Sequence, residues 1–288
     1  MRYVPEKSTG LPDKREIVGS AKRDILGIPI YSPTDLEALF WMYAPVWEVR
    51  TEAEYDRIGA PIWTPGGALD IDTRQPTAYT LLSFTRFGNE TLTQLNYIIW
   101  FPARPKEHAL DINGGMLDGV NYRVTLDRNG NPLLYETIHN CGCYYEAYPT
   151  GRLRVREKID YAEPPLILKA PELAPVDERM TVAMEARTHY VRHLYPAARR
   201  SHPEAMAYSL TDYGALRSLP DPKGGRRNMF RPDSLAPGSE RLERFILWPT
   251  EVVSPGAMRQ WGRHAVAFVG ERHFDDPFFM NAMFMKNY

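Results

Sequence analysis

Apolar and polar residues alternate over short stretches through the middle of the chain, which is the pattern of half-buried β-strands. Aromatic and β-branched residues dominate four such stretches, residues 78–84, 91–101, 122–126 and 133–138. Turn-forming residues separate the members of each pair, Gly88-Asn89 in the first and 127–132, with its Asn-Gly step, in the second. Alternation returns at 180–187. These patterns predict two hairpins followed by a further strand.

Two segments carry the signals of helix starts instead. Ser32 followed by Pro33 predicts an N-cap and a first helical position, and apolar residues at helical spacing continue until Pro45. Asp276 and Pro277 repeat this signal near the end of the chain. The predicted helices cover residues 33–44 and 277–285.

Many short strands against two helices predict an α+β, strand-dominated fold. We expect an antiparallel β-sheet or barrel-like core over about residues 78–270, with a few peripheral helices. Residues 1–30 are polar and lack a clear period, so they are expected to form an N-terminal surface arm. Residues 31–288 should form a single compact α+β domain, because the only boundary signal is a proline-rich crossing at 164–175.

Composition narrows the range of partners. The 288 residues are 43% hydrophobic and 25% charged with a net charge of −1, so no basic field gathers nucleic acid. Nowhere do about 18 apolar residues run together, and the first residues lack the apolar core of a signal peptide. We therefore expect a soluble protein with a small-molecule or metal ligand and with neither nucleic acid nor membrane as partner. Composition indicates no compartment and no oligomeric state.

Both cysteines of the chain lie in one short segment, His139-Asn140-Cys141-Gly142-Cys143. Zinc and copper bind well to thiolates and imidazoles, so the segment predicts a His-x-Cys-x-Cys metal site. In a flat strand His139 and Cys143 would lie about 13 Å apart, too far to share an ion. The chain is therefore expected to leave strand geometry at Gly142, since glycine adopts backbone conformations closed to other residues.

Such a site needs a further ligand from elsewhere in the chain. His264 begins an apolar strand, where a buried imidazole without a partner would cost about 1–3 kcal/mol, and His273 is the second candidate. The predicted function is accordingly a metal-binding soluble protein, with zinc or copper as cofactor and with enzymatic activity undecided. Its predicted ligands are His139, Cys141, Cys143, His264 and His273.

Three other interpretations of the cysteines stay open. Cys141-Gly142-Cys143 could act as a thiol/disulfide redox pair, whose short and strained ring would be easily reduced. Cys141 could be a nucleophile with His264 as base and Asp275 as the orienting group. Finally, both cysteines could simply be buried in a non-catalytic ligand-binding β module, because free cysteine is among the most buried residue types.

The remaining polar residues favour structural roles. His189 and His193, four residues apart, are expected on a solvated face rather than at a metal. Asp276 is expected to cap the last helix, and Arg259 to neutralise acidic residues on a solvated face. No motif in the sequence indicates a substrate.

Overall fold

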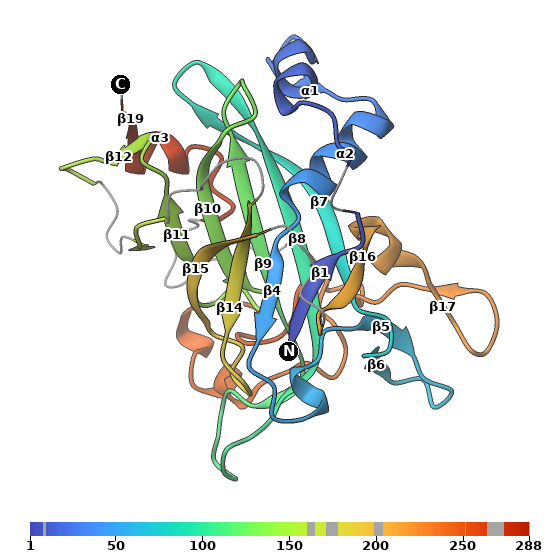
Figure 1. Ribbon diagram of the computed structural model, residues 1–288. Helices are drawn as coiled ribbons and strands as arrows, with labels where there is room; N and C mark the ends of the chain where they lie inside the picture. The colour runs from blue at the N-terminus through green and yellow to red at the C-terminus, as the bar shows by residue number, and fades with distance from the viewer. Residues whose placement is uncertain are drawn as a thin grey trace.

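The computed structural model describes residues 1–7, 10–159, 165–170, 178–198, 204–250, 252–263 and 274–287. Its centre is one large sheet, so the predicted strand-dominated α+β fold is confirmed (Figure 1). In spatial order the sheet contains β13 (Leu166–Ile167), β11 (Glu146–Pro149), β10 (Pro132–His139), β9 (Gly115–Leu126), β8 (Glu90–Arg104), β7 (Thr77–Phe87), β16 (Met206–Asp212), β1 (Arg2–Pro5), β4 (Val46–Val49), β14 (Glu178–Met184) and β15 (Val191–Ala198).

The sheet is mixed rather than purely antiparallel. Strands β7 to β10 form the antiparallel ladder that the alternating runs predict, although each strand is longer than its predicted run. Strand β16 pairs in parallel with both β7 and β1, and β14 pairs in parallel with β4. Parallel pairs join segments that are far apart in the sequence, so local turn signals cannot reveal them.

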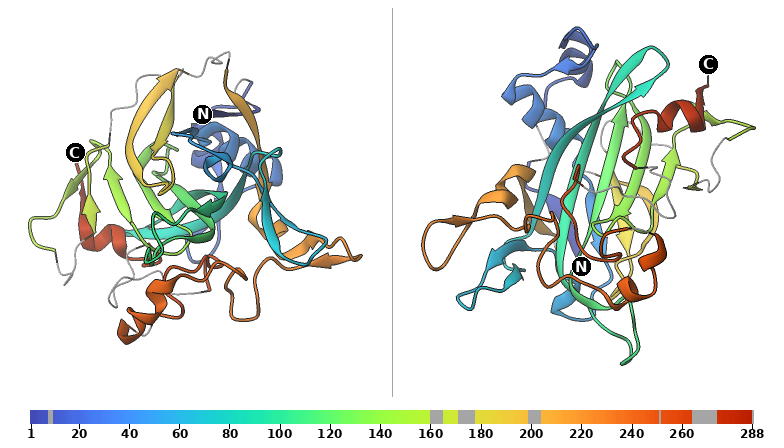
Figure 2. Two further views of the ribbon diagram at one scale, coloured as in Figure 1. Left: turned by 90° about the horizontal axis from the view of Figure 1, so that it is seen from below. Right: turned by 180° about the vertical axis from the view of Figure 1, so that it is seen from behind.

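The sheet curls on itself, as the view along the strands shows (Figure 2, left). Aromatic side chains fill the inside of the curl: Tyr122 of β9 lies 6.2 Å from Trp47 of β4 and 6.1 Å from Tyr97 of β8, measured between ring centroids. Because β9 and β4 are well separated in the sheet order, the Tyr122–Trp47 contact shows that the interior is packed across the curl. Apolar burial of such large rings is the main source of stability here.

Described segments that follow β16 in the chain pack on the outer face of the sheet (Figure 2, right). Ile98 and Trp100 of β8 point outward, because side chains alternate along a strand, and they pack in one cluster with Met258, Trp261 and Phe274. Both faces of the central strands are therefore buried, and β8 is buried without a break from residue 91 to residue 101.

The N-terminal residues differ from the surface arm predicted for 1–30. Strand β1 lies within the sheet between β16 and β4, and Tyr3 is fully buried with its hydroxyl accepting a hydrogen bond from the Ile58 N–H at 3.2 Å. Helix α1 (Lys14–Ser20) buries Ile17 and Val18. A strand of four residues is too short for alternation to stand out from a polar background.

Helix α2 (Pro33–Tyr43) confirms the first helix prediction, and its Ser32 hydroxyl accepts from the Asp35 N–H at 3.1 Å. The second helix is shorter than the predicted 277–285: α3 covers Phe279–Met283, and β19 (Phe284–Lys286) follows it. Pairing of β19 with β12 (Leu153–Val155) outweighs the local helix propensity there. Asp276 still accepts a hydrogen bond from the Phe278 N–H at 2.8 Å.

The remaining described elements are short. They are β2 (Lys22–Arg23), β3 (Pro29–Ile30), η1 (Glu54–Asp56), β5 (Ala60–Trp63), β6 (Leu69–Asp72), η2 (Tyr213–Ser218), β17 (Leu219–Pro220), β18 (Arg226–Arg227), η3 (Leu242–Phe245) and η4 (Trp248–Thr250). None of the helices in the described part of the chain is long and apolar enough to cross a membrane.

Candidate functional site

The segment that holds both cysteines forms a tight turn at the end of β10. The Gly142 N–H donates to the His139 carbonyl at 2.7 Å, the His139 N–H donates to the Cys143 carbonyl at 3.0 Å, and Gly142 has φ = 89°. The expected departure from strand geometry at Gly142 is therefore confirmed. Asn140 anchors the turn by donating to the Gly119 carbonyl at 2.8 Å, and a Cβ at Gly119 would collide with the Asn140 amide.

The turn folds the two thiols toward each other, so that they interact electrostatically. Cys141 is 8% exposed, Cys143 is partly exposed, and both are free thiols. A hydrogen bond from Cys143 and the charge of His139 lower the pKa of Cys141 to about 7, although burial opposes this. The same sulfur–sulfur hydrogen bond, together with burial, raises the pKa of Cys143 well above its usual value. Cys141 is thus the thiolate of the pair and Cys143 its proton donor.

A buried arginine lies against this turn. Arg259 is only 2% exposed, and its backbone N–H donates to the Asn140 carbonyl at 3.0 Å. Its guanidinium donates to three backbone carbonyl groups, those of Val253, Ser254 and Ala257. The solvated face predicted for Arg259 is therefore wrong: packing between the C-terminal loop and the sheet, which sequence spacing does not reveal, buries the side chain.

A second buried arginine approaches from the loop before η3. Arg241 donates to the backbone carbonyl groups of Met116, Leu117 and Ser239. Burial lowers the pKa of both Arg241 and Arg259, whereas the charges of Asp118, Cys141 and Glu243 act in the opposite direction on Arg241, and those of Cys141, Cys143 and Glu243 do so on Arg259. Within the described ranges neither guanidinium has a carboxylate at ion-pair distance, and a thiolate at Cys141 would add to the anions that offset their charge.

Behind the turn runs a chain of buried carboxylates and imidazoles. Asp118 of β9 contacts two histidines, with His189 Nδ1 at 2.8 Å and His139 Nδ1 at 3.5 Å. The other nitrogen of His189 lies 3.2 Å from Asp56, and the ring stacks on Phe101 with centroids 3.9 Å apart. His189 is thus completely buried, contrary to the predicted solvated face, whereas His193 is exposed as predicted.

These contacts shift the pKa values of Asp118 and His189. Burial alone would raise the pKa of Asp118, but hydrogen bonds from His139 and His189 hold it far below its usual range. Burial alone would lower the pKa of His189, but hydrogen bonds to Asp118 and Asp56 raise it. His189 is therefore an imidazolium held between two carboxylates, and Asp118 orients His139 toward the cysteine turn.

Two tyrosines and an arginine close the site above His139. The His139 ring centroid lies 5.0 Å from that of Tyr144 and 5.7 Å from that of Tyr190. The Arg104 guanidinium lies 5.1 Å from the Tyr190 ring centroid and hydrogen-bonds both tyrosines. His139 Nε2 is buried and has no hydrogen-bond partner among the described residues.

Backbone strain gathers around the same residues. Six non-glycine residues of the described chain have positive φ, and four of them flank this cluster: Leu117, Tyr144, Arg187 and His189. Such conformations cost roughly 1–3 kcal/mol each and persist where the surrounding structure imposes them, frequently at functional sites. The strain is therefore an independent indication that this end of the sheet is the functional site.

Only part of the predicted metal site can be compared with the structure. His264 and His273 lie outside the described residues, and in the described part no group of three His, Cys, Asp or Glu side chains is placed to hold one ion. The zinc or copper site therefore stays a prediction. Asp275 acts electrostatically on Arg123, on the outer face of the sheet, and because His264 lies outside the described residues, the interpretation of Cys141 as a nucleophile also stays a prediction.

Sequence reasoning missed most of the residues around the thiols. Asp118 does not stand out in the sequence, because β9 also contains the polar residues Asn121, Arg123 and Thr125. Arg241 and Arg259 do not stand out either, because their loops look like any polar connection.

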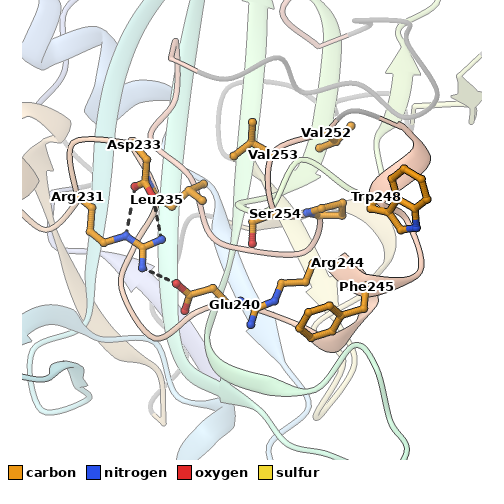
Figure 3. Close-up of a pocket in the computed structure, with 11 residues that line it drawn as sticks. Arg231, Asp233, Leu235, Glu240, Arg244, Phe245, Trp248, Val252, Val253 and Ser254 are labelled. Atoms are coloured by element: carbon orange, nitrogen blue, oxygen red, sulfur yellow. Dashed lines mark hydrogen bonds and ion pairs between the residues drawn. The ribbon is translucent and has the colours of Figure 1, made fainter.

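A surface pocket of about 580 Å³ shares the loop that holds Arg259 (Figure 3). Val253 and Ser254 line the pocket, and their carbonyl groups also accept hydrogen bonds from Arg259. The exposed rings of Phe245 and Trp248 form another part of its lining. The pocket and the Arg259 side chain therefore share this loop.

Comparisons with protein-family models, with curated proteins and with solved structures find no match for this chain. The chemistry of the site itself therefore has to indicate the function. That chemistry is a thiol of lowered pKa, a neighbouring thiol, two buried guanidinium groups and an imidazole that contacts a carboxylate.

Proposed function

We propose that Cys141 and Cys143 form a redox-active dithiol that cycles between two thiols and one disulfide. The observation that supports it best is the tight turn at Gly142, which holds two free thiols two residues apart beside the buried Arg259. Thiolate is the reactive form of cysteine, and nearby cations favour it. Cys141 is accordingly the sulfur that reacts first, and Cys143 is the sulfur that closes the disulfide.

The turn already holds the sulfurs on the same side of the backbone. Oxidation removes two electrons and two protons from the pair and forms one S–S bond, with the electrons passing to a disulfide or peroxide oxidant. An external dithiol reverses the step in two exchanges. Its first thiol attacks the Cys141 sulfur and releases Cys143, and its second thiol then attacks the first and releases Cys141, which leaves the external dithiol as a disulfide. The short ring across Gly142 is strained, and strained disulfides are more easily reduced, so the oxidised form should be recycled readily.

A metal complex is the competing proposal, because it would use the same sulfurs. The unpartnered Nε2 of His139, with a carboxylate behind the ring, is the observation that favours it. Elemental analysis of protein purified without a histidine tag decides between the two proposals. About one equivalent of zinc or copper, lost in Cys141→Ala, would support the metal complex.

A redox titration tests the dithiol directly. The protein is equilibrated with mixtures of reduced and oxidised glutathione, quenched with acid, and its free thiols are counted by alkylation and mass spectrometry. We expect a two-electron transition in which both thiols disappear together. Cys141→Ser and Cys143→Ser should show no such transition and should form mixed disulfides with glutathione at most. Two thiols that remain free across the whole range of potentials would refute the proposed function.

A further inference from the structure

The two sulfurs differ in solvent exposure, and this difference limits the size of the oxidant that can react with them. Cys141 is 8% exposed and packs in the apolar cluster that contains Trp100, Ile138 and Trp261. Cys143 is the more exposed sulfur, but it retains its proton. A disulfide substrate must place one of its own sulfurs in line with the attacking thiolate, which requires room around that thiolate. The sulfur that bulky disulfides can reach is thus the unreactive one.

We infer that the oxidant of this dithiol is a small hydroperoxide, of the size of hydrogen peroxide, which reaches Cys141 much faster than larger disulfides do. The inference rests on the proposed dithiol function and names its substrate. It is carried by the burial of Cys141, by the buried guanidinium groups and by the tight turn that holds both sulfurs.

The guanidinium groups suit the leaving group of this reaction. Attack of a thiolate on a peroxide expels a hydroxide or alkoxide ion, whose charge develops beside the sulfur. Arg259 uses Nε and Nη2 on backbone carbonyl groups, and its Nη1 has no acceptor among the described residues. A fixed positive charge in a site largely closed to water stabilises a developing oxyanion more than water does. Arg259 is therefore expected to accelerate the first step.

The second step joins the two sulfurs of one tight turn, which Gly142 separates. In the first step the Cys141 thiolate attacks one oxygen, the O–O bond breaks, and the expelled hydroxide takes up a proton to become water. Cys141 is then a sulfenic acid. In the second step the Cys143 sulfur attacks the Cys141 sulfur, and its proton leaves with the hydroxyl group as a second water. In total two thiols and hydrogen peroxide give one disulfide and two waters.

Rates of oxidation with three oxidants test the inference on the full chain. Hydrogen peroxide, cumene hydroperoxide and oxidised glutathione are each mixed with reduced protein, and disulfide formation is followed by quenched alkylation and mass spectrometry. Hydrogen peroxide should be the fastest by about tenfold or more over oxidised glutathione at equal concentration, with cumene hydroperoxide slower than hydrogen peroxide. Equal or faster oxidation by oxidised glutathione would overturn the inference while leaving the dithiol function intact. Absence of a disulfide with all three oxidants would refute the dithiol function itself.

Two variants separate the steps. In Cys143→Ser, hydrogen peroxide should leave a sulfenic acid on Cys141 that dimedone traps, whereas absence of a dimedone adduct would contradict the peroxide step. Arg259→Lys keeps a positive charge and the fold but loses the planar donor, and it should slow oxidation by hydrogen peroxide about tenfold. The exposed Arg226→Lys is the matched control and should leave the rate unchanged. An Arg259→Lys rate equal to that of Arg226→Lys would exclude Arg259 from the step.

Discussion

At the cysteine turn, each buried ionisable side chain is held in one charge state by a nearby group. Cys143 donates to the Cys141 sulfur, and Asp118 and Asp56 hold His189 from its two sides. A buried charge without such compensation would cost free energy, so removal of one partner should shift the pKa of the other. This dependence makes the residue-scale account testable one contact at a time.

The hydrogen bond between the sulfurs can be tested by comparing two replacements of Cys143. Serine keeps a donor at this position, whereas alanine removes it. The midpoint of the pH–rate profile for alkylation of Cys141 by iodoacetamide should lie higher in Cys143→Ala than in Cys143→Ser. The expected difference is roughly one pH unit, since one such donor to a charged group is worth about 1.5 kcal/mol. Identical midpoints would show that Cys143 does not stabilise the thiolate.

His189 should make the stability of the protein depend on pH. Its pKa is raised in the folded state, so its contribution is complete below its unfolded pKa of about 6.5 and is lost as pH rises through the folded value. The free energy of unfolding in urea should therefore fall as the pH rises above about 6.5, by at most about 1.4 kcal/mol per pH unit from this residue.

Two histidine variants test this assignment. His189→Gln should lose this part of the pH dependence, because glutamine carries no titrating proton. His193→Gln, which replaces an exposed histidine of the same hairpin, should retain it. A His189→Gln variant with the slope of the wild-type protein would show that another group causes the effect.

At the scale of elements, the sequence predicts what depends on local pattern. The hairpins β7–β8 and β9–β10 are predicted because alternation and an Asn-Gly turn lie within one short stretch. Strand β1 is not, because four residues flanked by polar sequence carry too little pattern. The end of α3 is misplaced because pairing with a distant strand competes with helix propensity.

The position of β1 inside the sheet leads to a large expected effect for Tyr3→Ala. Tyr3 is fully buried, so the change removes a ring from the core and should lower the free energy of unfolding by about 3–5 kcal/mol. Ile25→Ala is the control within the first 30 residues, because Ile25 is 99% exposed and should change stability by at most about 0.5 kcal/mol. Equal, small effects in urea denaturation would favour a surface arm.

Strands β9 and β10 also share a buried ion pair on the outer face of the sheet. Arg123 Nε lies 2.8 Å from Glu136, and the Tyr145 hydroxyl donates to the same carboxylate at 2.7 Å. Glu136→Ala leaves the guanidinium charge buried and should cost about 3–5 kcal/mol of stability in urea denaturation.

An exposed pair provides the control for this prediction. Glu37→Ala breaks the bond between Glu37 and Lys7, both of which are exposed, and should cost at most about 1 kcal/mol. Similar losses of stability in Glu37→Ala and Glu136→Ala would mean that the inner pair is hydrated.

At the scale of the whole molecule, the site forms only because distant segments meet at one end of the curled sheet. Asp56 comes from η1, Asp118 from β9, His189 from the turn before β15, and Arg259 from the C-terminal loop. The sequence reveals the cysteine turn because its residues are adjacent, and the turn at Gly142 follows from glycine geometry. The carboxylate, the second histidine and the arginines could not be predicted, since their proximity depends on the closure of the sheet.

The central claim is that Cys141 and Cys143 of one chain react with each other. Its most direct test is the intact mass of the protein after brief exposure to diamide, an oxidant that converts thiols to disulfides, followed by alkylation. The account predicts a monomer that has lost two hydrogen atoms, has no alkylated thiol, and regains both thiols with dithiothreitol. Two alkylated thiols, or disulfide-linked dimers in place of that monomer, would contradict it.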